Sequence, residues 1–305
     1  MGNIYKINPQ WDGDTIKTLS FSSVLWDFDM LQLLTLWSKY NVRGEGVNVY
    51  VLDTGIDFKH SAFAKKSLTT KSFVPTETEA MDLNGHGTWC CGKVGGWGIG
   101  IAPGCNIISA KVLNANGECS DTEIINALKW VLAQPKPHLV NMSLGGTNYN
   151  KEQDDLCTQL YEKGCIIVAA AGNENTEEKS YPAAYKNVLA IAAYNSTQQK
   201  ANFSNYGDYI TVAAPGVSCY SSVPHGFRRL SGTSMASPTV VGLLAIGLSY
   251  IYTKKPSIDP KTARDIVVNS IKTTAIDLGT VGFDKFYGYG GISGVKFLEA
   301  IAKAV

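Results

Sequence analysis

Apolar and amphipathic segments alternate along most of the chain. Short apolar runs at 107–112, 138–142 and 165–170 predict buried strands. Between them, residues 122–132 and 151–163 carry apolar side chains at helical spacing. Strands that alternate with helices in this way are typical of a parallel sheet. We therefore expect an α/β fold, namely a three-layer, doubly wound, mostly parallel sheet with helices on both faces.

Two polar residues stand where predicted elements end or begin. Asp53 ends the apolar, β-branched run at 47–52, which predicts another buried strand. Open α/β sheets bind their ligands at the carboxyl ends of such strands. His86 stands between Gly85 and Gly87 at the start of a predicted helix of small residues. The flanking glycines allow its imidazole to reach a neighbouring side chain without a clash.

A third candidate is Ser234, which follows Gly232 and precedes an apolar run at 239–252 that predicts a long helix. A turn of this kind exposes a serine hydroxyl, and the helix N-terminus directs free N–H groups at developing negative charge. Taken alone, a serine here is more often an N-cap. Together, however, an acid, an imidazole and a hydroxyl form the set that orients, deprotonates and attacks.

The blocks around these three residues resemble the signature blocks of the subtilisin-like serine proteases. They are Asp53-Thr54-Gly55, His86-Gly87-Thr88 and Gly232-Thr233-Ser234-Met235-Ala236-Ser237-Pro238. The resemblance runs from about Leu36 to the turn Tyr287-Gly288-Tyr289-Gly290, which is most of the chain. It implies a subtilisin-like fold and a serine endopeptidase that uses these residues as its catalytic triad and needs no cofactor.

Two further blocks, at 140–146 and 169–174, resemble family segments that wall the substrate cleft. Their small residues leave a slot typical of a specificity pocket, although small residues also simply let strands turn closely. The resemblance implies that the amide of Asn173 contributes to an oxyanion hole. It also implies that extended substrate pairs with the chain at 117–120 and 143–145. The implied substrate-binding residues are Gly117, Glu118, Cys119, Ile124, Ser143, Leu144, Gly145, Ala170, Gly172 and Ser180.

Three features near the implied site add detail to the resemblance. Asp121 falls near the fourth subsite, where an acid could favour a basic substrate side chain or simply interact with a helix dipole. Cys90 lies one helical turn after His86, and thiol-containing relatives have a cysteine there. The resemblance implies that the loop that holds a tight calcium ion in relatives is deleted at 92–100, so we expect no tight metal site.

The length, charge and cysteine content of the chain limit which partners and which cellular location we expect. The chain has 305 residues, a net charge of +1 and 17% charged residues, so we expect one soluble domain without a nucleic-acid or membrane partner. Its longest apolar run, after Ser234, is shorter than the roughly 20 residues of a membrane span. Seven cysteines without disulfide-scaffold density favour a cytoplasmic location. A secreted location follows instead if a leader and a prodomain have been removed.

Residues 1–23 form an N-terminal extension in our division, with the peptidase domain at 24–305. Such segments commonly pack on the surface as arms. The alternative is a regulatory strap, because intracellular relatives block their own cleft with a short extension that carries a proline beside the would-be cleaved bond. Ile7-Asn8-Pro9-Gln10 matches such a segment weakly. A separate inhibitor chain is a further alternative.

Three functions agree with these features. A broad-specificity endopeptidase acting on protein or peptide substrates is favoured. A narrow-specificity processing or self-regulated protease would use the same chemistry under control. A peptide-binding pseudoprotease is disfavoured because the triad residues and Asn173 are all present.

Overall fold

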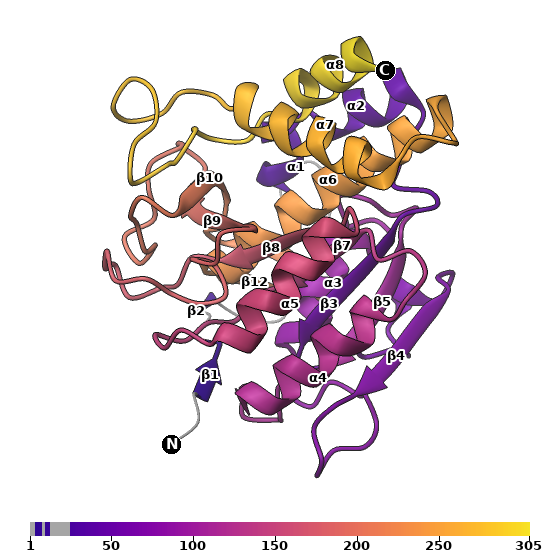
Figure 1. The fold of residues 1–305 in the computed structure, drawn as a ribbon, viewed down its shortest axis with the longest axis vertical. Helices are drawn as coiled ribbons and strands as arrows, with labels where there is room; N and C mark the ends of the chain where they lie inside the picture. Colours follow the sequence, from indigo (N-terminus) through magenta and orange to yellow (C-terminus); the bar gives the residue numbers. More distant parts are fainter. Residues whose placement is uncertain (1–3, 8–9, 13–24) are drawn as a thin grey trace.

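The computed structural model describes residues 4–7, 10–12 and 25–305. Within these residues the fold is organised around a parallel sheet of seven strands (Figure 1). Their order across the sheet is β10 (Ile210–Pro215), β9 (Val188–Tyr194), β8 (Ile166–Ala170), β7 (Leu139–Met142), β3 (Asn48–Asp53), β5 (Asn106–Lys111) and β4 (Leu68–Ser72). Each pairing in this sheet is parallel. The α/β fold predicted from the sequence is confirmed.

The sheet separates two hydrophobic cores, as the central strand β3 illustrates. Side chains alternate between the two faces of a strand, so Val49 and Val51 pack into one core while Tyr50 and Leu52 pack into the other. Both faces are covered by helices, which explains why this strand is apolar at successive positions. The first core contains side chains of α3 (His86–Gly95) and α6 (Thr233–Lys254), and the second those of α4 (Asp121–Leu132) and α5 (Lys151–Glu162).

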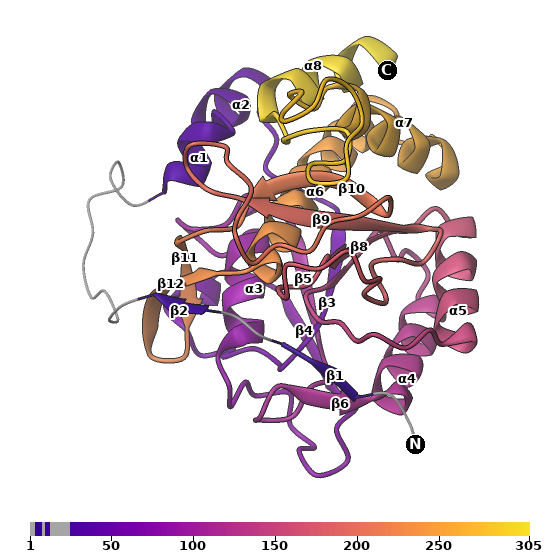
Figure 2. The same ribbon diagram turned by 90° about the vertical axis from the view of Figure 1, so that its left-hand side faces the viewer.

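The remaining described elements lie around this framework (Figure 2). On the α6 side of the sheet are the helices α1 (Trp26–Met30), α2 (Leu33–Tyr40), α7 (Pro260–Thr273) and α8 (Gly294–Ala304), and a 3-10 helix spans Ser61–Phe63. Two small antiparallel sheets are formed by β1 (Ile4–Lys6) with β6 (Glu118–Ser120), and by β11 (Cys219–Val223), β12 (Gly226–Ser231) and β2 (Gln10–Asp12). The extension therefore contributes a strand to each small sheet.

Helix α6 is longer than the sequence pattern suggested. It spans 22 residues, so the expectation that no apolar segment reaches the length of a membrane span was wrong. Its most apolar window has a mean hydropathy of 1.5, and 94% of that window is buried inside the protein. Such burial is typical of the central helix of a folded core, where a helix is apolar on all sides.

Candidate active site

The three predicted catalytic residues and Asn173 meet at the carboxyl edge of the sheet. Asp53 ends β3, and Ser143 and Asn173 follow the neighbouring strands β7 and β8. His86 is the first residue of α3, and Ser234 lies in the first turn of α6. Parallel strands bring distant segments together at this edge, which is where open α/β sheets place their sites.

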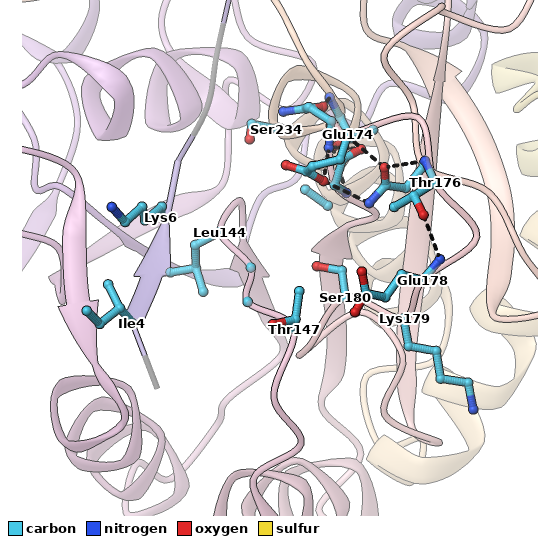
Figure 3. A pocket seen from close by; sticks show the side chains of 17 residues that line it. Ile4, Lys6, Leu144, Thr147, Glu174, Thr176, Glu178, Lys179, Ser180 and Ser234 are labelled. Carbon is cyan, nitrogen blue, oxygen red and sulfur yellow. Dashed lines mark hydrogen bonds between the residues drawn. The ribbon is translucent and has the colours of Figure 1, made fainter. Parts of the chain in front are cut away.

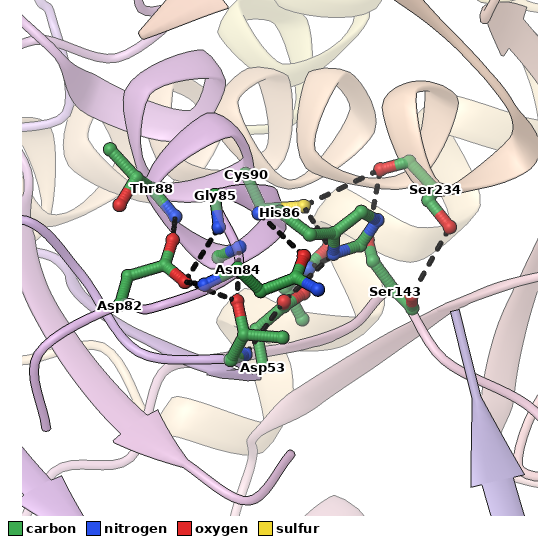
Figure 4. A network of polar contacts seen from close by, with 12 residues as sticks. Asp53, Asp82, Asn84, Gly85, His86, Thr88, Cys90, Ser143 and Ser234 are labelled. Carbon is green, nitrogen blue, oxygen red and sulfur yellow. Dashed lines mark hydrogen bonds and ion pairs between the residues drawn. The ribbon is translucent and has the colours of Figure 1, made fainter. Parts of the chain in front are cut away.

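Asp53 and His86 form a buried pair (Figure 4). The distance from His86 Nδ1 to Asp53 Oδ1 is 2.7 Å, and both side chains are fully buried. The Thr54 N–H also donates to Asp53 Oδ1, at 2.8 Å. A carboxylate at this distance favours the tautomer with its proton on Nδ1, which leaves Nε2 as the acceptor. Among the described residues, Nε2 has no hydrogen-bond partner.

Asp82 fixes the first turn of α3, a role that our sequence analysis missed. Its Oδ1 accepts hydrogen bonds from the Gly85 N–H and the Thr54 hydroxyl, and its Oδ2 accepts one from the Thr88 N–H, each at 2.8 Å. These bonds satisfy otherwise unpaired donors at the helix start and join that turn to the end of β3. An acid four residues before His86 was the signal that could have revealed it.

The backbone of Ser234 is held from outside its own helix. Pro238 lacks an N–H group, so the Ser234 carbonyl loses its usual helical donor four residues later. The Ser143 hydroxyl donates to this carbonyl instead, at 3.0 Å, and Cys90 Sγ lies 3.7 Å from it. The Asn141 amide in turn donates to Ser143 Oγ at 3.0 Å. The end of β7 thereby fixes the first turn of α6.

The Ser234 hydroxyl points toward β7 in this structure (Figure 4). Its Oγ donates to the Ser143 carbonyl at 3.1 Å rather than to His86 Nε2. Rotation about the Cα–Cβ bond of Ser234 is therefore required before the imidazole can accept the hydroxyl proton. Catalytic hydrogen bonds are often unformed until a substrate is bound, so this geometry is compatible with a nucleophile.

The Asn173 amide is oriented by the residue before Ser234. The N–H and the hydroxyl of Thr233 both donate to Asn173 Oδ1, at 2.8 and 2.9 Å. The amide nitrogen is thereby turned away from Thr233. An amide held by its oxygen offers its N–H groups in a fixed direction, which is what stabilisation of a developing oxyanion requires.

A cavity of about 280 Å³ adjoins Ser234 (Figure 3). Gly145 is essential to its shape, because a Cβ atom there would lie 2.5 Å from Ser180 Oγ. Glu174 also lines the cavity, and its Oε2 accepts hydrogen bonds from the Asn173 N–H and the Asn205 side-chain amide. The predicted substrate-binding residues around it are Leu144, Gly145, Ala170, Gly172 and Ser180.

Comparisons with known proteins agree with this arrangement. The sequence pattern described as the subtilase family matches residues 44–290, which is most of the chain. The chain belongs to the subtilase family. The resemblance inferred from the three sequence blocks is thus confirmed, as is the subtilisin-like fold.

Several curated proteins are similar to this subtilase. It is 36% identical to subtilisin DY of Bacillus licheniformis over 86% of the chain and 92% of that relative. It is 38% identical to a subtilisin-like protease of Coccidioides posadasii over 70% of the chain, and 32% identical to alkaline serine exoprotease A of Vibrio alginolyticus over 88%. The aligned regions span only 55% and 50% of these last two relatives.

The remaining predicted substrate-binding residues of this subtilase lie beside its own N-terminal strand. β1 pairs with β6, which places Tyr5 opposite Cys119 and Lys6 opposite Glu118. Ile124 is buried on α4, directly after β6, and the Ile7 N–H donates to the Gly117 carbonyl at 3.3 Å. Gly117, Glu118, Cys119 and Ile124 therefore lie along or just behind one wall of a groove. We use this name for the space between β6 and Gly145, which β1 occupies.

Lys6 connects this wall of the subtilase groove to the other one. Its N–H donates to the Gly145 carbonyl at 3.2 Å, and the Gly145 N–H donates back to the Lys6 carbonyl at 3.4 Å. On the other side of the site, Gln10 of β2 pairs with Ser231, three residues before Ser234. Asn8 and Pro9, the centre of the segment matched to a strap, lie outside the described residues.

Cys90 lies beneath the imidazole of this subtilase, as its spacing from His86 predicted. Its Sγ is 3.8 Å from His86 Nδ1 and is buried. Burial, aided by the nearby Asp53 carboxylate, raises the pKa of the Cys90 thiol well above its usual value. The thiol is therefore neutral near pH 7, which does not suit a nucleophile.

The chain after α3, where the family resemblance places a calcium loop, forms a tight turn. After α3, the Gly100 N–H donates to the Gly96 carbonyl at 2.8 Å, and the Trp97 N–H donates to the Ala62 carbonyl at 2.9 Å. Among the described residues, one group of three metal-ligating side chains lies close enough to share an ion, and it consists of Asp53, His86 and Cys90. The turn offers no carboxylate, so its residues do not fit calcium.

Proposed function

We propose that this subtilase is a serine endopeptidase that cleaves peptide bonds through an acyl-enzyme on Ser234. The observation that carries the proposal is the buried pair of Asp53 and His86, in which Oδ1 and Nδ1 are 2.7 Å apart. This pair lies beside the turn that contains Ser234. Asp53 holds the imidazole in the tautomer that leaves Nε2 free to take the Ser234 proton. His86 then returns that proton to the leaving amine, and water hydrolyses the acyl-enzyme by the reverse sequence.

The oxyanion that forms during attack needs donors already in place. The Asn173 amide and the Ser234 N–H at the start of α6 supply them, and the helix dipole adds positive potential at the same point. Because the amide oxygen is bound twice by Thr233, little reorientation accompanies the reaction. No cofactor takes part in these steps.

We expect broad specificity, because the two groove walls can recognise a substrate through its main chain. The described N-terminal strand forms such bonds with Gly117 and Gly145. Main-chain pairing is nearly independent of side-chain identity, so proteins and peptides of many sequences are the proposed substrates. The cavity beside Ser234 then selects the residue before the cleaved bond.

Self-regulation is a second candidate, favoured by the position of β1. We infer that the extension acts as an intramolecular inhibitor, because it forms the main-chain hydrogen bonds that extended substrate is expected to use. An inhibitor on the same chain is present at high effective concentration, so moderate intrinsic affinity is enough to cover the groove. A cytoplasmic location is a further proposal, supported by seven cysteines that lack the density of a disulfide scaffold.

Labelling with a fluorophosphonate probe tests the enzyme proposal. The full chain should be labelled once, and Ser234→Ala should lose both the label and at least about 10³-fold in kcat, a lower bound beside the roughly 10⁶-fold loss known from subtilisin itself. Ser38→Ala, which removes an exposed hydroxyl on α2, is the matched control and should change neither. Labelling that persists in Ser234→Ala would contradict the assignment. An unlabelled chain that still binds peptide would support a pseudoprotease.

A further inference from the structure

Tyr5 of β1 extends from the groove into a side pocket, whose inner end is formed by the polar residues Asp121 and Gln153. Its side chain is fully buried, and its hydroxyl lies 3.0 Å from Asp121 Oδ1 and 3.1 Å from Gln153 Oε1. The Gln153 amide also donates to Asp121 Oδ1, at 2.9 Å. This donation fixes which end of the glutamine amide faces the phenol, so two acceptors converge on one hydroxyl.

The rest of the side pocket matches the aromatic ring. A Cβ atom at Gly146 would lie 3.4 Å from Tyr5 Cδ1, so the ring lies against the backbone of residue 146. The ring belongs to the same hydrophobic cluster as Ile124 and Leu144. An apolar slot that ends in two hydrogen-bond acceptors has the shape and polarity of a tyrosine side chain.

The main-chain register relates this pocket to the cleaved bond. A substrate that follows the described residues of the extension, from Lys6 beside Gly145 to Gln10 beside Ser231, would reach Ser234 after the position of Tyr5. Asp121 and Ile124 also fall at the fourth subsite by family resemblance. Both observations agree with Tyr5 occupying P4, the fourth position before the cleaved bond.

We propose that the fourth subsite of this enzyme recognises a phenolic hydroxyl. Peptides with tyrosine at P4 are then bound and cleaved in preference to peptides with phenylalanine there. The inference deepens the proposed endopeptidase function and rests on it wherever cleavage is the measurement. Asp121 and Gln153 are the specificity-determining residues. Residue 5 of the extension is thus the same tyrosine that this subsite prefers in substrates.

The physical basis is the loss of the hydrogen bonds that the phenol makes, above all the one to the Asp121 carboxylate. Phenylalanine at P4 would donate no proton to Asp121 Oδ1, which would keep the Gln153 amide at 2.9 Å, or to the buried Gln153 Oε1, which would keep the Tyr185 hydroxyl at 3.5 Å. A hydrogen bond that involves a charged carboxylate is stronger than a neutral one, and a site built for a hydroxyl rejects the analogue that lacks it. We therefore expect at least a tenfold preference for tyrosine.

The test uses the full chain with Tyr5→Ala, which empties the side pocket and leaves Asp121 and Gln153 intact. Peptides identical except for tyrosine, phenylalanine or lysine at P4 are compared by kcat/KM. Because residual inhibition by the extension reduces kcat/KM equally for all peptides, the ratio between them reports the subsite alone. The expected tyrosine-to-phenylalanine ratio is about 10 or more.

Adding Asp121→Ala to this variant should lower the ratio, because it removes the charged acceptor and leaves Gln153 Oε1 for the phenol. The matched control is Asp155→Ala, which removes an exposed acid of α5 that pairs with Lys151, and it should preserve the ratio. Equal kcat/KM for tyrosine and phenylalanine, or a higher value for lysine, would overturn the inference while leaving the protease function intact.

A binding measurement separates this inference from the proposed function. The full chain with Tyr5→Ala and Ser234→Ala is titrated with the same peptides, and the tyrosine peptide should bind at least about tenfold more tightly. If no peptide is cleaved by the active form but this affinity ratio is found, the endopeptidase proposal fails and the subsite inference stands. Equal affinities would overturn the inference whatever the catalytic result.

Discussion

The thiol of Cys90 offers a direct test of the geometry around the imidazole. A mercurial that binds Cys90 Sγ should displace His86, 3.8 Å away, and inactivate the enzyme. Cys90→Ala should retain most of its activity and be protected, because the thiol takes no part in the proposed chemistry. Activity after incubation with a mercurial gives the readout, and Cys91→Ala is the matched control because it leaves Cys90 in place. Undiminished inactivation of Cys90→Ala would identify another cysteine as the target.

Single residues were predictable where the chemistry lies close to a recognisable turn. Asp53, His86 and Ser234 each stand within two residues of a glycine at an element end, so their candidate status followed from the sequence. The carbonyl contact of Ser143 and the phenol contact of Tyr5 were not foreseen. These bonds join segments far apart in the chain, 148 positions apart for Tyr5 and Gln153, and no local pattern specifies them.

At the scale of elements, the strand β1 makes the inhibitory role of the extension testable. Lys6→Pro in the full chain removes the N–H that donates to Gly145 and should weaken the strand's hold on the groove. We expect a several-fold rise in kcat/KM for an added peptide, because the groove is open for a larger fraction of the time.

Lys6→Ala is the matched control for that experiment. It removes the exposed ion pair with Glu118, whose atoms are 2.8 Å apart, but keeps the backbone N–H. An exposed pair contributes little, so activity should stay near that of the unaltered chain. Equal activity of the proline variant, the alanine variant and the unaltered chain would leave β1 only a packing role.

The elements that were predicted from periodicity have small errors at their ends. The expected strand at 107–112 is β5, and the expected helix at 151–163 is α5, each shifted or shortened by one residue. The main error was α6, which begins at Thr233 and extends to Lys254. Small and hydroxylated residues at its start resemble a loop in sequence, but in the fold they are buried and held by tertiary contacts.

For the whole molecule, His138 predicts a loss of stability in acid. Burial lowers the pKa of His138 from 6.5 to about 4, and its Nδ1 accepts a hydrogen bond from the Asn48 N–H at 2.9 Å. A histidine with a lowered pKa stabilises the fold fully above its unfolded pKa and loses that contribution as the pH falls toward its folded pKa. Between pH 6.5 and 4 the free energy of unfolding should fall by up to about 3 kcal/mol from this group.

Urea unfolding at several pH values measures this effect. His138→Gln should show a shallower loss between pH 6.5 and 4 than the unaltered chain, because it has no imidazole to protonate. His225→Gln, which changes an exposed histidine, should follow the unaltered chain. Parallel pH profiles for His138→Gln and the unaltered chain would show that His138 is not the group responsible.

The molecule should also be insensitive to chelators. A calcium site held at about 1,000 times its Kd would contribute about 4 kcal/mol, so its removal would lower Tm by several degrees. Here the turn after α3 does not fit calcium, and the buried pair of Lys93 and Asp27 joins that helix to α1 instead. EDTA should therefore change Tm and activity little. A fall of more than about 5 °C, reversed by calcium alone, would contradict this expectation.

The position of the extension also determines the order in which the molecule can assemble. β1 and β2 are synthesised before every strand that they pair with, and β12, the partner of β2, comes from the last third of the chain. Closing so long a loop is entropically costly until the intervening domain has folded. The extension must therefore dock last, onto a groove that is already formed. Each newly made molecule passes through an uncovered state, and the time spent there is set by the docking rate of a few residues.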